Sequence, residues 1–220
     1  YGLSEAALGE AGVSGFRVVS KFMPPTSSES LENQFQHSLS KLKIDSLYGY
    51  LAHRPLELLE NEKHWGMLEN LKEKGKIQKI GFSLNSVKEL DRLTSAGMIP
   101  DLIQVPFNYL DRRFEARLIR LRELSCEIHS RSTFLQGLFF VSPGDLSDHF
   151  KSIKEFIAGL QFKYGDQLPS ALLKFVYDSP LIDVVIMWVD SLEQLQANLA
   201  MLRNAPALNH RIPIFSEDIL

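Results

Sequence analysis

Six short apolar runs, separated by amphipathic segments, constrain the fold of this chain more than any other feature. The runs cover residues 16–22, 47–52, 76–83, 102–107, 127–134 and 183–189. Between them apolar residues recur at helical spacing, as in the stripe formed by Leu31, Phe35, Leu39 and Leu42. Alternating strands and helices favour an α/β fold in which a parallel sheet is joined by right-handed crossovers.

The same alternation favours a (β/α)8 TIM barrel over a Rossmann fold, because no Gly-x-Gly-x-x-Gly motif follows a strand. A closed barrel needs eight strands over roughly 250 residues. This chain has 220 residues and offers six expected strands. We therefore expect that the first one or two strands are missing from this chain. No break in composition divides it, so residues 1–220 are predicted to form a single N-terminally truncated barrel domain.

The composition argues against several other classes of protein. The chain has 24 basic and 27 acidic residues and a net charge of −3, which gives no support to a nucleic-acid or anionic-membrane partner. Cys126 is the single cysteine, so no intrachain disulfide can form and a cytoplasmic location is expected. No apolar segment approaches the roughly 18 residues of a membrane span. The unpaired edges of a truncated barrel favour a homo-oligomer.

Polar side chains stand where successive strands are expected to end, which is where α/β sheets and barrels place their chemistry. Lys21 ends the first strand, and it is as consistent with an exposed lysine at the rim as with a Schiff base or an electrostatic role. His53 follows the second strand, either as a structural histidine or as a donor or proton shuttle. Later strands also carry polar residues at or near their ends: Ser83 and Asn85, Gln104 and Asn108, and Arg131 and Ser132.

Other catalytic motifs are missing from the sequence. The remaining histidines are scattered, with no His-Glu-x-x-His and no carboxylate cluster at ligand spacing, so no metal site is predicted. There is no Gly-x-Ser-x-Gly motif either. Cys126 lies in a predicted helix-to-strand turn without an obvious base, and we interpret it as structural.

Several motifs, in order along essentially the whole chain, resemble those of the aldo-keto reductase family. They are Tyr1-Gly2-Leu3-Ser4-Glu5-Ala6-Ala7-Leu8-Gly9, Val18-Val19-Ser20-Lys21, Tyr50-Leu51-Ala52-His53-Arg54-Pro55, Gly75-Lys76-Ile77-Gln78-Lys79-Ile80-Gly81-Phe82-Ser83, Ile103-Gln104-Val105-Pro106-Phe107-Asn108 and Arg131-Ser132-Thr133-Phe134-Leu135-Gln136-Gly137-Leu138. The last of these is most similar to a bacterial-type branch of the family.

This resemblance implies a TIM barrel that reduces an aldehyde or ketone, a sugar-related one among the options, to an alcohol with NADP(H) or NAD(H). It implies that Tyr1 donates the proton, that Lys21 stabilises the phenolate and that His53 orients the carbonyl. A free phenol has a pKa of about 10 and needs the nearby cation to react at neutral pH. The resemblance further implies cofactor contacts from Ser83, Gln104, Arg131, Ser132, Gln136, Gly137 and Asn198.

The chain also departs from the family pattern. The family's aspartate, which pairs with the lysine, lies upstream of the tyrosine, and here the sequence starts at Tyr1. Trp188 occupies a strand end that normally carries a small or basic residue near the cofactor phosphates. Gln194 aligns with the arginine that grips the 2′-phosphate, so the sequence does not favour NADPH over NADH. Two alternatives therefore stay open: a catalytically impaired barrel that serves as a binding or scaffold subunit, and a Schiff-base aldolase using Lys21.

Overall fold

The computed structural model describes residues 2–24, 30–61 and 63–209 of the chain. The chain divides into two compact units. Unit 1 comprises residues 1–104 and 121–127, and unit 2 comprises residues 105–120 and 128–220. The expectation of one barrel domain over residues 1–220 stays a prediction.

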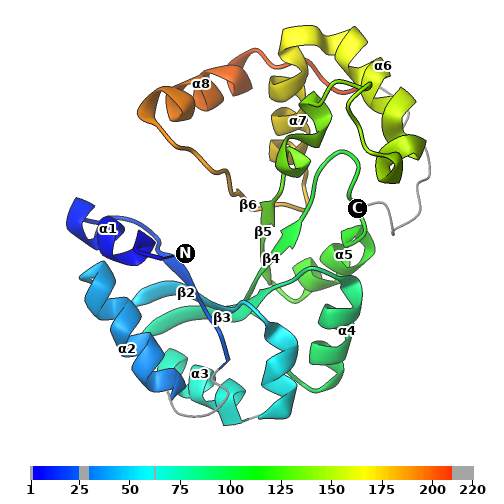
Figure 1. Cartoon of the computed structure of the whole chain (residues 1–220). Coiled ribbons are helices and arrows are strands. Elements are labelled where there is room, and N and C mark those ends of the chain that lie inside the picture. The colour runs from blue at the N-terminus through cyan, green and yellow to red at the C-terminus, as the bar shows by residue number, and fades with distance from the viewer. Residues whose placement is uncertain (1, 25–29, 62, 210–220) are drawn as a thin grey trace. The chain divides into compact units, whose positions relative to one another are not determined.

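Strands and helices alternate along the chain (Figure 1). The helices are α1 (Ser4–Ala11), α2 (Leu31–Leu42), α3 (Lys63–Glu73), α4 (Val87–Ser95), α5 (Glu115–Glu123), α6 (Lys154–Tyr164), α7 (Leu168–Tyr177) and α8 (Leu192–Arg203). The strands are β1 (Val19–Phe22), β2 (Leu47–Ala52), β3 (Ile77–Ser83), β4 (Leu102–Pro106), β5 (Glu127–Arg131) and β6 (Val184–Val185). Short 3-10 helices occupy some connections: η1 (Pro55–Glu60), η2 (Leu135–Phe140), η3 (Asp148–Ile153) and η4 (Gly165–Gln167).

The strands form one sheet in the order β1-β2-β3-β4-β5-β6. The β1–β2, β2–β3, β3–β4 and β5–β6 pairs run parallel. Neighbours in the chain are therefore neighbours in the sheet, which is the order that strand–helix–strand units give when each connection leads to the adjacent strand. This arrangement confirms the predicted α/β class, and the further strands of a closed barrel remain a prediction.

The core of unit 1 forms where α2 packs on β1 and β2. Ser30 caps α2, since its side chain accepts a hydrogen bond from the Asn33 amide, and the predicted apolar stripe of this helix is buried. The ring of Tyr50 in β2 lies 5.4 Å from the ring of Phe35 in α2 and 4.7 Å from that of Phe22 in β1. Apolar spacing in the sequence thus predicted both this helix and the face that it buries.

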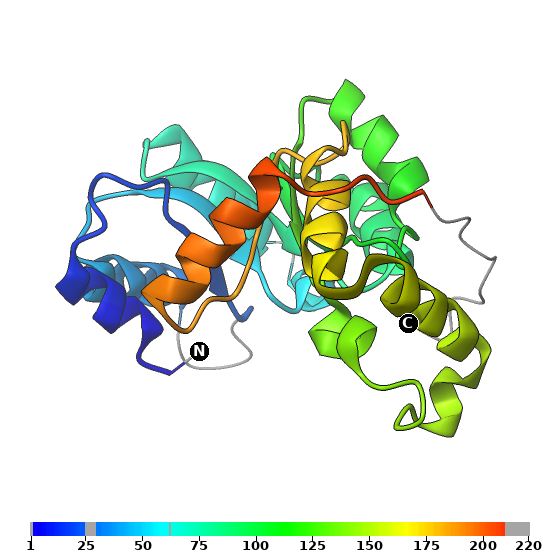
Figure 2. The ribbon, with the colours of Figure 1, turned by 90° about the horizontal axis from the view of Figure 1, so that it is seen from above.

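Unit 2 has a core of its own between the segment after β4 and the helices α6 and α7. These two helices are drawn in yellow-green and yellow in Figure 2. The Tyr109 ring packs against Phe156 of α6 at 6.1 Å and against Phe175 of α7 at 4.9 Å, edge to face in the second case. The buried members of this cluster are Tyr109, Leu110, Phe139, Ile153, Phe156, Ile157, Leu160, Leu168 and Leu172.

Several predicted boundaries were wrong. The first strand starts at Val19 and not at residue 16. Phe16 lies outside the sheet, and its side chain is 75% exposed. The fifth strand stops at Arg131, since Ser132 takes a left-handed conformation with φ 61°. The last strand has only two residues, and Trp188 beyond it is 77% exposed. The first helix ends at Ala11, directly before Gly12 with φ 85°.

Among the described residues, every helix is too short or too polar to cross a membrane.

Candidate functional site

The register of unit 1 brings four predicted site residues to one edge of the sheet. Lys21 pairs with Leu51, which lies two residues before His53. Leu51 pairs with Gly81, which lies two residues before Ser83, and Ser83 pairs with Gln104. Because side chains alternate along a strand, partners and residues two apart share a face. Lys21, Ser83 and Gln104 therefore share a face, and His53 directly follows the end of β2 beside them. These four residues, near the carboxyl ends of β1 to β4, are here called the strand-end row.

Backbone contacts hold this row in place. The amide of His53 donates to the carbonyl of Phe22 at 2.8 Å, which fixes the residue after β2 beside the end of β1. The amide of Leu84 donates to the carbonyl of Gln104 at 2.9 Å in the same way. Exposure differs along the row: His53 is exposed and Lys21 is half-buried, whereas Ser83 and Gln104 are 3% and 5% exposed. The row thus combines an accessible imidazole and ammonium with two buried groups that can both donate and accept hydrogen bonds.

Tyr1, the predicted proton donor, lies outside the described residues. The helix that follows it is anchored beside the row in unit 1. Ser20, the neighbour of Lys21, donates a hydrogen bond from its hydroxyl to the Glu5 carboxylate of α1 at 2.6 Å.

Unit 2 carries the other predicted cofactor residues on a turn at the end of β5. Ser132, Leu135 and Gln136 have φ values of 61°, 46° and 53°, and Gly137 has φ 89°. Such left-handed conformations are costly for residues other than glycine and collect at functional sites. The Arg131 guanidinium donates to the Ser132 hydroxyl at 3.2 Å, and the Gln136 side chain is exposed.

Comparison with known proteins assigns the family. The model of the aldo/keto reductase family matches residues 1–209. The chain belongs to the aldo/keto reductase family. Among curated proteins it is similar to YtbE of Bacillus subtilis (strain 168), described as an uncharacterized oxidoreductase, with 32% identity over 136 residues. That match covers 60% of this chain and 48% of YtbE, so the chain spans about half the length of this relative.

Solved aldo-keto reductases share the fold of this family member. The apo form of AKR11C1 from Bacillus halodurans matches with a TM-score of 0.72 at 17% identity, over 98% of this chain and 80% of the other. An enzyme from Klebsiella pneumoniae, solved in complex with NADPH, matches with a TM-score of 0.67 at 22% identity, over 93% of this chain and 71% of the other.

Asn198, the last predicted cofactor residue of this reductase-family chain, lies half-buried on α8 in unit 2. Ser191 caps this helix by accepting from the Gln194 amide at 3.2 Å. The Gln194 side chain is itself engaged, because its oxygen accepts from the Asp190 amide at 2.8 Å. Hydrogen bonds to the Glu193 carboxylate from its own backbone amide and then from the Ser191 side chain lower the pKa of Glu193. The start of α8 is therefore acidic and hydrogen-bonded.

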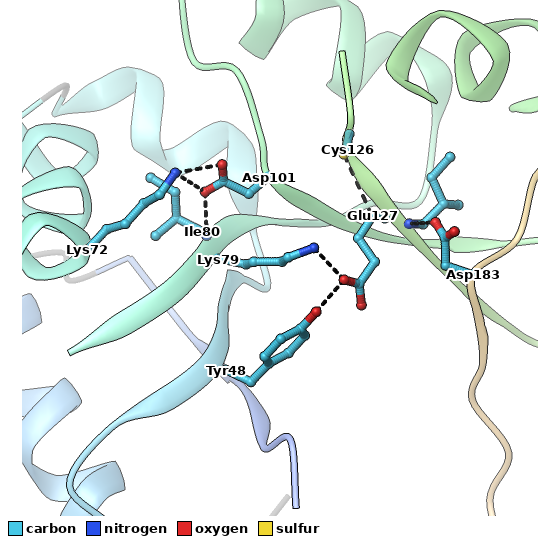
Figure 3. A network of polar contacts seen from close by, with 9 residues as sticks. Tyr48, Lys72, Lys79, Ile80, Asp101, Cys126, Glu127 and Asp183 are labelled. Carbon is cyan, nitrogen blue, oxygen red and sulfur yellow. Dashed lines mark hydrogen bonds and ion pairs between the residues drawn. The ribbon is translucent and has the colours of Figure 1, made fainter. Parts of the chain in front are cut away.

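A polar network at the opposite end of the strands of unit 1 was missed by sequence reasoning (Figure 3). The Tyr48 hydroxyl and the Lys79 ammonium both donate to Oε2 of Glu127. Burial lowers the pKa of Lys79, but hydrogen bonds and charge interactions with Glu127 and Tyr48 outweigh it and raise the pKa above 10.5. In barrels this end of the strands serves stability and not catalysis. The sequence signal was a charged residue inside one predicted strand, Lys79, and another at the start of a second, Glu127.

No three His, Cys, Asp or Glu side chains gather into a metal-binding group in the part of the chain that the structure describes.

Proposed function

We propose that this chain reduces an aldehyde or ketone to an alcohol with a nicotinamide cofactor, NADP(H) or NAD(H). The observation that carries the proposal is the strand-end row of Lys21, His53, Ser83 and Gln104. Family membership supports it, as do the Klebsiella pneumoniae aldo-keto reductases solved with NADP and NADPH. A small carbonyl compound is the proposed substrate. The single cysteine supports a cytoplasmic setting, and a homo-oligomer remains a prediction.

The residues present fit such a cofactor. Ser83 and Gln104 are buried and offer donors and acceptors that match a carboxamide. In unit 2, Ser130 Oγ and Thr133 Oγ1 are buried and find no hydrogen-bond partner among the described residues, which is costly unless a ligand or water satisfies them. We assign the cofactor contacts to Ser83, Gln104, Arg131, Ser132, Gln136, Gly137 and Asn198. When bound, the cofactor supplies the hydride.

The protein's own groups manage the proton and the charge on the substrate oxygen. Tyr1 is proposed to donate its phenolic proton to the carbonyl oxygen. Lys21, as an ammonium, favours the phenolate and so makes the phenol a better acid at neutral pH. His53 is proposed to hold the carbonyl by a hydrogen bond that strengthens as negative charge develops on the oxygen. These three roles require the side chains to reach one carbonyl oxygen. The position of Lys21 and His53 at the same edge of the sheet supports the proposal.

Kinetics of matched variants test this assignment. Purified protein is assayed for consumption of NADPH and of NADH with a panel of aldehydes and ketones. We expect Tyr1→Phe nearly to abolish turnover and Lys21→Met to lower kcat by roughly a hundredfold or more, because proton transfer loses its donor or the cation that activates it. Lys41→Met, on the exposed side of α2, is the control and should keep full activity.

Full turnover in Tyr1→Phe would remove the assigned proton donor. The scaffold alternative makes the opposite prediction about binding. If titration with NADPH and with NADH leaves the tryptophan fluorescence of the unsubstituted protein unchanged and no carbonyl is reduced, the binding or scaffold role is favoured over the reductase.

A further inference from the structure

Asn108, which follows β4 in unit 2, is fully buried and uses its whole side chain in hydrogen bonds. Its Oδ1 accepts from the backbone amides of Leu110 and Asp111 at 3.0 and 2.9 Å. The backbone N–H of Asn108 donates to the carbonyl of Asp111 at 3.0 Å, which closes the loop that leads into α5. Its Nδ2 donates to the carbonyl of Ser132 at 3.1 Å. One side chain therefore joins the loop after β4 to the turn after β5.

The far side of this loop is held by a second contact, the ion pair between the side chains of Asp111 and Arg113. Asp111 is 2% exposed, and both of its carboxylate oxygens accept from the Arg113 guanidinium, at 2.7 and 3.0 Å. Such a bidentate pair is rigid and strong when shielded from water. The loop can therefore act as a fixed support, so the bond from Asn108 transmits a defined position to Ser132.

Ser132 is the residue at which the turn after β5 needs support. Its backbone is left-handed, and its carbonyl also accepts from the Leu135 amide at 3.0 Å, which forms the turn that carries Gln136 and Gly137. Its hydroxyl accepts from Arg131. The Arg131 carbonyl is held at 3.1 Å by the Phe107 amide, a bond that any residue at 107 except proline could make. The bond to the Ser132 carbonyl, in contrast, comes from the side chain of Asn108 and therefore depends on which residue stands at position 108.

We propose that Asn108 is a positioning residue: it fixes Ser132 and, through Ser132, the Arg131 guanidinium and the turn to Gly137 in the arrangement that receives the cofactor. This proposal rests on the proposed function for the identity of the ligand. Asparagine suits the position because it combines an acceptor for two loop amides with a donor for a carbonyl. Aspartate has the same shape and the acceptors but lacks the donor.

The test compares Asn108→Asp with Asp111→Asn. The first variant loses the bond to Ser132 and keeps the acceptor for the loop, whereas the second weakens the ion pair with Arg113 without touching the turn. Amide hydrogen exchange at Leu135 and Gly137 is measured without cofactor, and the Kd for NADPH is measured by fluorescence. Asn108→Ser, whose shorter side chain cannot reach Ser132, replaces the aspartate variant if that variant does not fold.

We expect both amides to exchange roughly tenfold faster in the Asn108 variant than in Asp111→Asn, and the Kd for NADPH to rise about five- to tenfold while kcat at saturating cofactor changes little. Unchanged exchange at Leu135 and Gly137 would overturn the proposal. An equal rise of Kd in Asp111→Asn would also overturn it, because the effect would then come from general loosening of the loop. If the unsubstituted protein binds no nicotinamide cofactor, the proposed function fails, and the exchange rates still decide whether Asn108 positions the turn.

Discussion

Glu127 is the first residue of β5, and one of its carboxylate oxygens accepts from both Tyr48 and Lys79 (Figure 3). The side chains of Glu127 and Lys79 are 13% and 27% exposed, so solvent screens this pair less than the ion pair of Lys72 with Asp101, at 30–41% exposure. Because the pKa of Lys79 is raised in the folded protein, its charged form stabilises the fold. That contribution is fully present below pH 10.5 and is lost as the pH rises through the higher folded pKa.

Replacing Glu127 with glutamine should therefore destabilise the protein by about 2 kcal/mol, because the buried part of Lys79 loses its counter-charge. Urea unfolding at pH 7.5 measures the loss. Lys72→Met is the matched control and should cost no more than about 0.5 kcal/mol, since Asp101 keeps its bond from the Ile80 amide at 3.1 Å. Equal losses in the two variants would mean that the shielding of Glu127 does not matter.

His64 on α3 carries a second pH effect at the residue scale. It is 8% exposed, and its Nδ1 has no hydrogen-bond partner among the residues described. Burial therefore lowers its pKa below 6.5. The unfolded chain binds a proton at His64 more readily, so the free energy of unfolding is unaffected by this group above pH 6.5 and falls as the pH drops below that value.

We expect His64→Gln to flatten the loss of stability between pH 6.5 and 5, whatever its effect at pH 7.5. Urea midpoints measured across this range test the slope. His37→Gln, at an exposed position on α2, should keep the slope of the unsubstituted protein. An unchanged slope in His64→Gln would show that other groups cause the acid sensitivity.

At the scale of elements, α1 is docked by a close approach to α2. A Cβ at Gly9 would lie 2.0 Å from the carbonyl oxygen of Lys41, so only glycine allows the two backbones to come this near. The Glu10–Lys43 ion pair, at 2.6 Å, and the bond between Glu5 and Ser20 lie on either side of this contact. Together they fix the helix that follows Tyr1 beside β1, the strand of Lys21.

Gly9→Ala should push α1 away from α2 and destabilise the protein by about 1–3 kcal/mol, because the clash is with backbone and cannot be relieved by a side-chain rotation. Thermal unfolding checks this. Gly66→Ala, on the exposed face of α3 where a Cβ meets nothing within 4 Å, should instead stabilise by about 0.5–1 kcal/mol. A stabilising Gly9→Ala would show that α1 is not held by this contact.

At the scale of the whole molecule, the chain is a member of the aldo/keto reductase family whose parallel strands present their carboxyl ends in chain order. The strand-end row in unit 1 and the turn of left-handed residues in unit 2 are each built by one unit. The row in unit 1 follows from a general rule: in a parallel sheet, residues that end consecutive strands collect at one edge.

The sequence by itself determined the features that depend on local pattern. Apolar spacing located α2 and its buried face, and the polar residues at or near the ends of apolar runs predicted Lys21, His53, Ser83 and Gln104 as site residues. Each of these signals lies within a few residues, where helix and strand geometry fix which side chains share a face.

Only the tertiary structure decided the contacts between residues distant in the chain. The bonds of Glu127 with Tyr48 and Lys79 join residues 79 and 48 positions apart, and Asn108 meets Ser132 across 24 positions. It also decided that β6 has only two residues and that Leu192, Leu195 and Leu199 of α8 are exposed, although their spacing predicts a buried face. A periodic pattern says which face is apolar, but strand register and backbone approach decide what that face meets.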